Sequence, residues 1–324
     1  MKPYKFRPYL KTVIWGGDKI APFKGIEQTQ ENIGESWEIS GVPGHESVCA
    51  DRGLENDEDK GLTLFQLIEK YKERLVGKAV YERFGSSFPL LVKIIDSKQD
   101  LSIQVHPNDE LAKQRHNCAG KTEMWYIIEA ELEAKIHVGL KKHITPDDYE
   151  QMATAEAGEG QNPFAEIMDC YNSRPGDCFF LPAGRLHAIG GGNLLAEIQQ
   201  TSDITYRVYD YGRKDAQGHP RELHIQQAKA AIDYTVYPEY RTQYDQSSPS
   251  AELVSCPYFT VRREVVSRQA RIDYQRDSFI IVMCLSGQAS VNGISARRGE
   301  TLLVPASNAV LDIQGTCTLL TATV

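Results

Sequence analysis

Short apolar segments alternate with polar turn residues along most of the chain. Seven runs have the length and the Val, Ile, Leu and Phe content that β-strands favour. They are residues 90–95, 101–106, 124–128, 178–181, 194–198, 279–285 and 301–304. Gly, Pro, Asn and Asp separate them, a pattern more typical of sandwiches and jelly rolls than of parallel α/β sheets. The sequence therefore predicts a mainly β protein.

Helical periodicity is confined to a few segments. The clearest helix begins after Thr63, a candidate N-cap, and ends at Gly77. Apolar residues recur at helical spacing within it at Leu64, Leu67, Ile68, Tyr71 and Leu75. A second helix is expected within 222–232 and a third near 146–152. We expect the segments at about 61–85 and 222–232 to be helical insertions in a β domain.

An internal repeat divides the chain into two units. Residues 175–184 (PGDCFFLPAG) are matched by 298–307 (RGETLLVPAS), and both read turn, apolar strand, then Pro-Ala and a small residue. The register places Val310 where the first copy has His187, and no His follows His224. We therefore expect units at 1–236 and 250–324, joined by a linker rich in Tyr, Gln, Ser and Pro. Chemistry that needs imidazole belongs to the first unit.

Charge and composition exclude several classes of function. The chain has 36 Lys plus Arg against 44 Asp plus Glu, a net charge of −8, which argues against a nucleic-acid partner. No apolar stretch approaches the roughly 18 residues that span a membrane, and the first residues lack the apolar core of a secretion signal. The seven Cys form no C-x-x-C pair, which favours reduced thiols. We expect a cytoplasmic protein with no membrane partner.

Polar side chains share a face on two of the predicted strands. In 101–106, the two-residue period puts Gln104 and His106 on the face opposite the apolar residues. In the strand that follows, Lys121 and Glu123 share a face in the same way. These strands can therefore present an amide, an imidazole, an ammonium and a carboxylate to one interior.

A second imidazole comes from His187, which follows Gly184. A glycine permits a tight turn that would direct His187 inward. Two imidazoles, a carboxylate and an amide oxygen suit zinc or another divalent metal. A lone His is more often a satisfied core or surface residue, so spacing leaves both interpretations open.

The motifs around these residues resemble a known family. Gly176-x5-Pro182-x-Gly184-x-x-His187 resembles the second cupin motif, and Gln104-x-His106 followed by Glu123 resembles the first. Four longer blocks are similar to type I mannose-6-phosphate isomerases: 34–38 (GESWE), 101–107 (LSIQVHP), 120–126 (GKTEMWY) and 197–210 (EIQQTSDITYRVYD). The match runs in order from about residue 10 to 235, and the length is that of the short bacterial form.

The resemblance implies a fold, a metal and a reaction. The fold is two cupin-type jelly-roll units, of which the C-terminal one is degenerate and metal-free. One zinc ion per chain is held by Gln104, His106, Glu123 and His187. The reaction is the reversible conversion of mannose 6-phosphate to fructose 6-phosphate through an enediol(ate).

The resemblance also assigns substrate contacts to Lys93, Lys121 and Arg207, and it makes Lys121 and Arg207 candidate catalytic residues. Lys93 has apolar neighbours on both sides, so it needs a partner or a polar pocket. A structural ion pair is the alternative for Lys121, which shares a face with Glu123. Arg207 lies an even number of residues from Glu197 and Asp203, so a continuous extended stretch would point all three the same way. Glu197 and Asp203 are then candidates for proton transfer or for orienting Arg207.

Two other functions use the same scaffold. An iron-dependent cupin oxygenase would have more imidazole ligands than this chain offers, since one position is Gln104. A non-catalytic sugar-phosphate sensor would have less need of both Lys121 and Arg207. A monomer is expected, since no heptad pattern or long apolar helix face is visible.

Overall fold

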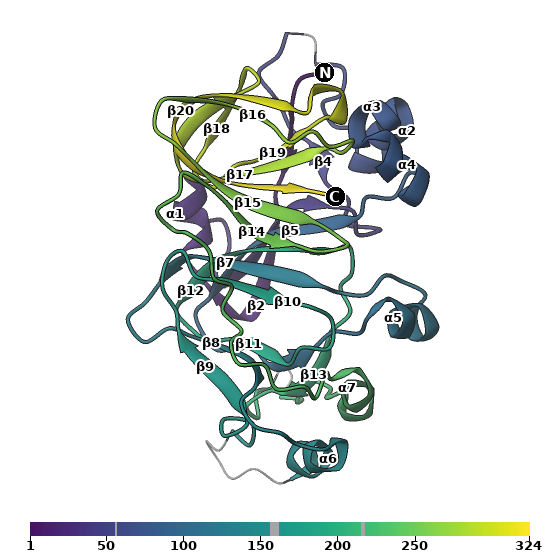
Figure 1. Cartoon of the computed structure of the whole chain (residues 1–324), viewed down its shortest axis with the longest axis vertical. Helices are drawn as coiled ribbons and strands as arrows, with labels where there is room; N and C mark the ends of the chain where they lie inside the picture. Colours follow the sequence, from purple (N-terminus) through teal and green to yellow (C-terminus); the bar gives the residue numbers. More distant parts are fainter. Residues whose placement is uncertain (56, 156–161, 215–217) are drawn as a thin grey trace.

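Three antiparallel β-sheets make up most of the molecule (Figure 1). The computed structural model describes residues 1–55, 57–155, 162–214 and 218–324. Strands outnumber helices in these ranges, which confirms the predicted mainly β architecture. Within the same ranges, no helix is long and apolar enough to cross a membrane.

Two of the sheets enclose an N-terminal barrel. The first has the strand order β10-β7-β12-β5-β2-β3, and the second has the order β13-β6-β11-β8-β9. The bounds in the first are β2 Tyr9–Gly17, β3 Ile33–Ser40, β5 Leu90–Ser97, β7 Glu123–Ala130, β10 Cys178–Leu181 and β12 Asn193–Gln200. Those in the second are β6 Ile103–Val105, β8 Lys135–Leu140, β9 Met168–Asn172, β11 His187–Ile189 and β13 Tyr206–Tyr209. Apolar side chains of both sheets pack into one core, which includes Trp125, Leu195, Ile136 and Ile189.

The third sheet has nine strands and holds the C-terminal unit. Its main order is β14-β15-β20-β17-β19-β1-β4, with β16 paired to β20 and β18 to β17. The bounds are β1 Tyr4–Arg7, β4 Val48–Cys49, β14 Ser250–Ser255, β15 Thr260–Val266, β16 Gln269–Asp273, β17 Ile280–Val291, β18 Ile294–Arg297, β19 Thr301–Val304 and β20 Val310–Thr323. The first strand of the chain thus pairs with β19 (Tyr4 opposite Leu303), and both termini lie beside this sheet (Figure 1). Strands β1 and β4 of the expected unit 1–236 therefore belong to the same sheet as the strands of the expected unit 250–324.

The two units correspond strand for strand. Neighbouring strands run β3-β5-β12-β7-β10 in the first and β14-β15-β20-β17-β19 in the second. A row of directly paired residues crosses the first set at Trp37, Lys93, Glu197, Trp125 and Phe179. The matching row crosses the second set at Glu252, Arg262, Thr321, Val282 and Leu302. Phe179 and Leu302 are also partners in the sequence repeat, so the repeat and the strand pairing give the same correspondence between the two units.

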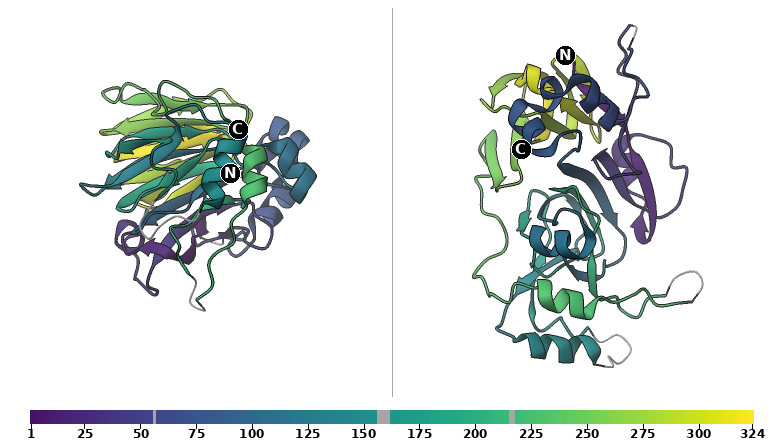
Figure 2. Two further views of the ribbon diagram at one scale, coloured as in Figure 1. Left: turned by 90° about the horizontal axis from the view of Figure 1, so that it is seen from below. Right: turned by 90° about the vertical axis from the view of Figure 1, so that its right-hand side faces the viewer.

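The helices are short and lie outside the sheets. Their bounds are α1 Ile20–Lys24, α2 Leu64–Tyr71, α3 Glu73–Val76, α4 Lys78–Phe84, α5 Asp109–His116, α6 Pro146–Thr154, α7 Ile225–Ala231 and the 3-10 turn η1 Ala306–Asn308. The segments expected near 146–152 and within 222–232 form α6 and α7. Lys229 of α7 reaches Asp147 (2.9 Å) and Glu150 (2.6 Å) of α6, so these helices lie side by side (Figure 2).

The single helix predicted after Thr63 is two helices. α2 begins with a capping box, in which the side chains of Thr63 and Gln66 each accept a hydrogen bond from the other's backbone. Lys72 then has a positive φ of 48°, which ends α2 and separates it from α3. Gly77 ends α3 as predicted. Lys is an ordinary helix former, so periodicity carried no sign of the break.

The helices α2 to α4 pack against the C-terminal unit (Figures 1 and 2). The two carboxylate oxygens of Asp277 accept hydrogen bonds from Lys78 N and Ala79 N, both at 3.0 Å, and so cap α4. Gly77 makes this approach feasible, because a Cβ there would lie 2.3 Å from the Asp277 carbonyl oxygen. The insertion expected at about 61–85 therefore bridges to the second unit.

Candidate metal centre and active site

Two imidazoles turn the same nitrogen into the N-terminal barrel. His106 follows β6, and His187 begins the neighbouring strand β11. Nδ1 of His106 lies 2.9 Å from the Ile204 carbonyl oxygen, and Nδ1 of His187 lies 2.8 Å from that of Arg185. A carbonyl oxygen only accepts, so each Nδ1 carries the proton and each Nε2 presents a lone pair. Both side chains are buried, and both Nε2 atoms could act as metal ligands.

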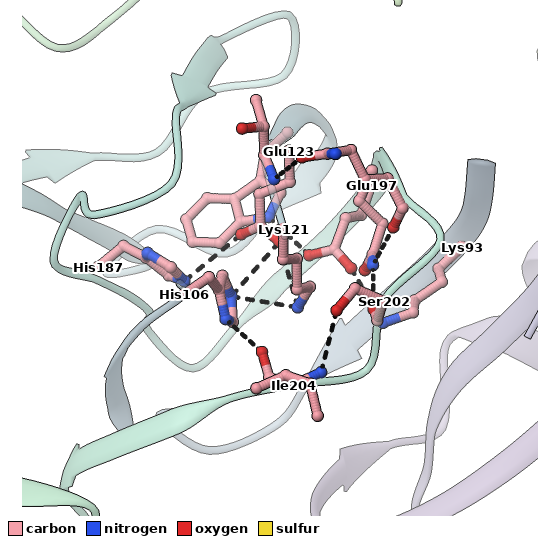
Figure 3. Close-up of polar contacts among 12 residues, drawn as sticks. Lys93, His106, Lys121, Glu123, His187, Glu197, Ser202 and Ile204 are labelled. Atoms are coloured by element: carbon pink, nitrogen blue, oxygen red, sulfur yellow. Dashed lines mark hydrogen bonds and ion pairs between the residues drawn. The ribbon is translucent and has the colours of Figure 1, made fainter. Parts of the chain in front are cut away.

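Glu123 faces these two nitrogens (Figure 3). Its Oε1 lies 3.4 Å from His187 Nε2, and its Oε2 lies 3.5 Å from His106 Nε2. The side chain is fully buried, no described residue hydrogen-bonds Glu123 Oε1 or His187 Nε2, and Lys121 Nζ lies 3.2 Å from Oε2. Buried polar atoms without partners are costly, and a carboxylate that faces imidazole lone pairs calls for a cation. The ligand atoms lie within 4.8 Å of one another, so these three residues fit one divalent ion.

Gln104 lies on the same face as this group. It pairs directly with His187 across β6 and β11, and its side chain lines the adjoining cavity. Directly opposed residues of an antiparallel pair point to the same side of the sheet. The amide oxygen of Gln104 is therefore available as a further ligand.

A glycine turn brings His187 to β6. Gly184 has a φ of 91°, which side chains other than hydrogen rarely tolerate. Its N–H donates to the His106 carbonyl oxygen at 2.9 Å, so the turn is held against the end of β6. This hydrogen bond occupies the His106 carbonyl oxygen, which would otherwise be available for pairing with a neighbouring strand. The strand β6 is shorter than the predicted strand 101–106.

A cavity of about 370 Å³ opens beside the metal-ligand group. Its wall carries five cations and three carboxylates, although the whole chain has a net charge of −8. These charged residues are Lys11, Lys93, Lys121, Arg207, Arg221, Glu35, Glu197 and Asp203. An excess of cations in a concave site attracts anionic small molecules. The cavity thus suits a substrate such as a phosphate ester.

Lys93 and Glu197 form a buried ion pair in this wall. Lys93 Nζ lies 3.1 Å from Glu197 Oε1, and Trp125 Nε1 donates to Glu197 Oε2 at 2.8 Å. Burial works to lower the pKa of Lys93, but Glu197 and then Glu35 outweigh it and hold that pKa above its usual value. Burial works to raise the pKa of Glu197, but Lys93 and then Lys121 bring it below its usual range. Both groups are therefore charged at neutral pH.

Lys121 connects the cavity with the metal-ligand group (Figure 3). Its Nζ lies 3.1 Å from His106 Nε2 and 3.2 Å from Glu123 Oε2. Burial raises the pKa of Glu123, while the Lys121 ammonium opposes that rise. The structural ion pair considered for Lys121 is thus present, and the same side chain also lines the cavity.

Arg207 and Glu197 reach the cavity from different sheets. Glu197 lies on β12 of the first sheet and Arg207 on β13 of the second, so the continuous extended stretch assumed for 197–207 is wrong. The chain leaves β12 at Gln200 and crosses to the other wall before β13. Asp203 lies in this crossing, and its side chain is exposed at the cavity. An even spacing in the sequence cannot reveal that the chain passes from one sheet to the other, because the two sheets meet only in the three-dimensional barrel.

The structure adds residues that the motifs did not single out. Glu35 accepts a hydrogen bond from Trp37 Nε1 at 2.6 Å and lies 3.7 Å from both Lys93 and Lys11. The block 34–38 had marked this segment without a role for Glu35. Arg221 lies outside every quoted motif, 11 residues after the block 197–210 ends, and no sequence signal pointed to it.

Two jelly-roll units, with a buried pair of imidazoles and a carboxylate in the first, define a cupin with a candidate metal centre. The family model "Phosphomannose isomerase type I, catalytic domain" matches residues 4–129. The model "Mannose-6-phosphate isomerase, cupin domain" matches residues 250–324. Both matches fall on the regions described above.

Relatives that match over nearly their whole length point to the same isomerase family. The chain is 36% identical over 312 residues to mannose-6-phosphate isomerase ManA of Bacillus subtilis, covering 94% of this chain and 93% of the relative. It is 34% identical to a mannose-6-phosphate isomerase of Streptococcus mutans, with 94% and 92% coverage. The crystal structure of a mannose 6-phosphate isomerase from Bacillus subtilis superimposes with a TM-score of 0.86 at 32% identity, covering 100% of both chains. The chain belongs to the type I phosphomannose isomerase family, whose members depend on a metal.

Proposed function

We propose that the chain interconverts D-mannose 6-phosphate and D-fructose 6-phosphate. The observation that carries this proposal is the buried Glu123, which faces two imidazole lone pairs beside a cation-rich cavity. Membership of the isomerase family supports it and argues against the oxygenase and sensor alternatives.

The metal of this proposal is one Zn²⁺ ion per chain, held by Gln104, His106, Glu123 and His187. Two imidazoles, a carboxylate and an amide oxygen suit zinc, and a single carboxylate leaves the centre with a net positive charge. When bound, such an ion polarises the oxygens at C1 and C2 of the sugar. The carbonyl partners of both Nδ1 atoms keep the imidazoles in the required tautomer.

The isomerisation moves one proton between C2 and C1. A base takes the proton from C2 of the open-chain aldose, and the C–H electron pair forms the C1–C2 double bond of an enediolate as the carbonyl π pair moves to O1. A proton then returns at C1, while the O2 proton passes to O1 and O2 becomes the ketone oxygen. Glu197 is proposed to carry this proton, because it is ionised, buried and in the cavity wall. Asp203 is proposed to orient the site, because it is exposed at the opening and its charge acts on Lys93.

The remaining catalytic work is electrostatic. Lys93 and Lys121 place fixed positive charge where the enediolate oxygens develop negative charge, and such preorganised groups lower a barrier without rearrangement. Arg207 contacts the substrate from the opposite wall. Lys93, Lys121 and Arg207 together are the proposed substrate-binding residues.

The proposal also includes the cellular compartment and the oligomeric state of the enzyme. We place the enzyme in the cytoplasm as a monomer that acts on a free hexose 6-phosphate. All seven cysteines are free, which suits a reducing compartment.

Fructose 6-phosphate formation from mannose 6-phosphate tests the function. Activity that a chelator removes and added Zn²⁺ restores is the expected result. A folded, zinc-loaded protein without this activity would reject the substrate, and restoration by iron together with oxygen uptake would favour the oxygenase. Unphosphorylated mannose is the control for the phosphate requirement.

A further inference from the structure

The cations in the cavity wall fall into two chemically different groups. Each lysine lies within 4 Å of a carboxylate, as for Lys93 with Glu197 and Lys121 with Glu123. Arg207 and Arg221 also line the cavity. Among the described residues, Arg207 has no ion pair, and its buried Nε has no hydrogen-bond partner. The positive charge that no carboxylate of the cavity wall balances is therefore that of the arginines.

Arg221 pairs with Asp210 and has further N–H donors that this pair does not use. Its Nε donates to Asp210 Oδ2 at 2.7 Å, and its Nη2 donates to Asp210 Oδ1. A guanidinium has five N–H donors, so three remain, two of them on Nη1. The buried Asp210 also binds Arg213, with Nη2 at 2.5 Å, so one carboxylate serves two guanidiniums.

The two arginines at the cavity repel each other. Burial, followed by the nearby Arg221 guanidinium, lowers the pKa of Arg207. Asp210 and the exposed Glu222 oppose this, and Arg213 adds to it. Guanidiniums in such proximity bind an oxyanion strongly, because its charge relieves their repulsion and its oxygens match the N–H geometry.

The register of the second sheet places Arg207 one strand from the candidate ligand Gln104 and two strands from His187. Arg207 pairs with Gln104, and Gln104 pairs in turn with His187. Two strand spacings, about 10 Å, therefore lie between the backbones of Arg207 and His187. A six-carbon sugar separates the reacting C1 and C2 from a phosphate at C6 by a comparable length.

We propose that Arg221 binds the phosphate group of the substrate, with Arg207 beside it, and that Asp210 positions Arg221. The inference rests on the proposed function, since it presumes a hexose 6-phosphate. It leaves Lys93 and Lys121 for the reacting end of the sugar. Arg221 is then a specificity residue that distinguishes phosphorylated from free sugars.

The test compares Arg221→Met with the wild type in two assays. Isothermal titration with inorganic phosphate needs no turnover, and we expect binding about 10-fold to 100-fold weaker, the range for loss of a charge-assisted hydrogen bond. We expect KM for mannose 6-phosphate to rise by a similar factor with little change in kcat.

Arg213→Met is the matched control, because Arg213 binds the same Asp210 but does not line the cavity. We expect its phosphate affinity and KM to match the wild type. Equal losses in both variants would overturn the proposal in favour of a scaffold around Asp210, as would unchanged phosphate affinity in Arg221→Met. Phosphate affinity that depends on Arg221 in a protein without isomerase activity would keep the anion site and reject the proposed function.

Discussion

Lys93 and Glu197 face each other across β5 and β12, with Nζ and Oε1 3.1 Å apart in the wall of the cavity. Neither side chain has appreciable contact with solvent. A buried ion pair contributes little net stability, yet loss of one partner leaves an uncompensated charge. The pair therefore keeps a carboxylate ionised at the place where proton transfer is proposed.

Lys93→Met should destabilise the protein by about 3–5 kcal/mol, because Glu197 loses its closest cation. Urea unfolding measures this loss. The double variant Lys93→Met/Glu197→Gln should recover most of the stability, since no buried charge then remains unpaired. Both variants are expected to be inactive. Equal stability of the single and double variants would contradict the coupling.

Substitution of the candidate metal ligand Glu123 should reduce metal binding, whereas substitution of Arg207 should reduce turnover and leave metal binding intact. In Glu123→Gln we expect the zinc content, measured by elemental analysis after dialysis, to fall well below that of the wild type. Arg207→Ala is the matched variant and should retain zinc while turnover falls. Loss of zinc in Arg207→Ala, with an unchanged rate per bound metal, would show that these roles are assigned wrongly.

Asp96 should make stability depend on pH. Its side chain is buried, and Oδ1 has no hydrogen-bond partner among the described residues. Burial therefore raises its pKa to about 6, although the hydrogen bond from Lys19 N at 2.6 Å opposes that rise. The folded protein then holds the proton more tightly than the unfolded chain, whose pKa is 3.8. Stability is fully present below that value and falls as pH rises through about 6, by roughly 3 kcal/mol in all.

Asp96→Asn is the corresponding test, because it keeps an acceptor for Lys19 N but cannot ionise. Urea unfolding near pH 8 should show the variant to be more stable than the wild type, and the difference should shrink near pH 4. A variant that is less stable at the higher pH would show that the carboxylate is stabilising as an anion.

Asp277→Ala should weaken the contact between α4 and the C-terminal unit. The variant leaves the N–H groups of Lys78 and Ala79 without their caps, which corresponds to a loss of about 1–2 kcal/mol. Thermal unfolding is the measurement. Asp277→Asn retains one oxygen and should lose less, while isomerase activity at low temperature should be unaffected in both. A loss of stability in neither variant would mean that solvent caps α4 equally well.

The local elements were largely predictable from the order of residues. Short apolar runs identified the cores of β5, β7, β10, β12, β17 and β19, because strands that are largely buried on both faces need apolar residues at successive positions. Capping and glycine signals identified the start of α2 and the end of α3. The break at Lys72, where φ is positive, was not predictable, because Lys is an ordinary helix former and gives no local signal of a helix end.

The candidate metal ligands could also be predicted from the sequence. Gln104 and His106 share a strand face, and Gly184 marks the turn that brings His187 in. Such local geometry follows from strand period and backbone freedom. The family motifs joined these pieces with Glu123 into one site.

Contacts between distant segments were decided by the folded barrel alone. Arg207 reaches the cavity from a different sheet than Glu197, Asp277 caps a helix almost 200 residues earlier, and Arg221 joins the site through Asp210. Strand period and capping act over a few residues, so the chain encodes them locally. Which walls meet across a barrel depends on the packing of all strands at once, and no short window of residues contains that information.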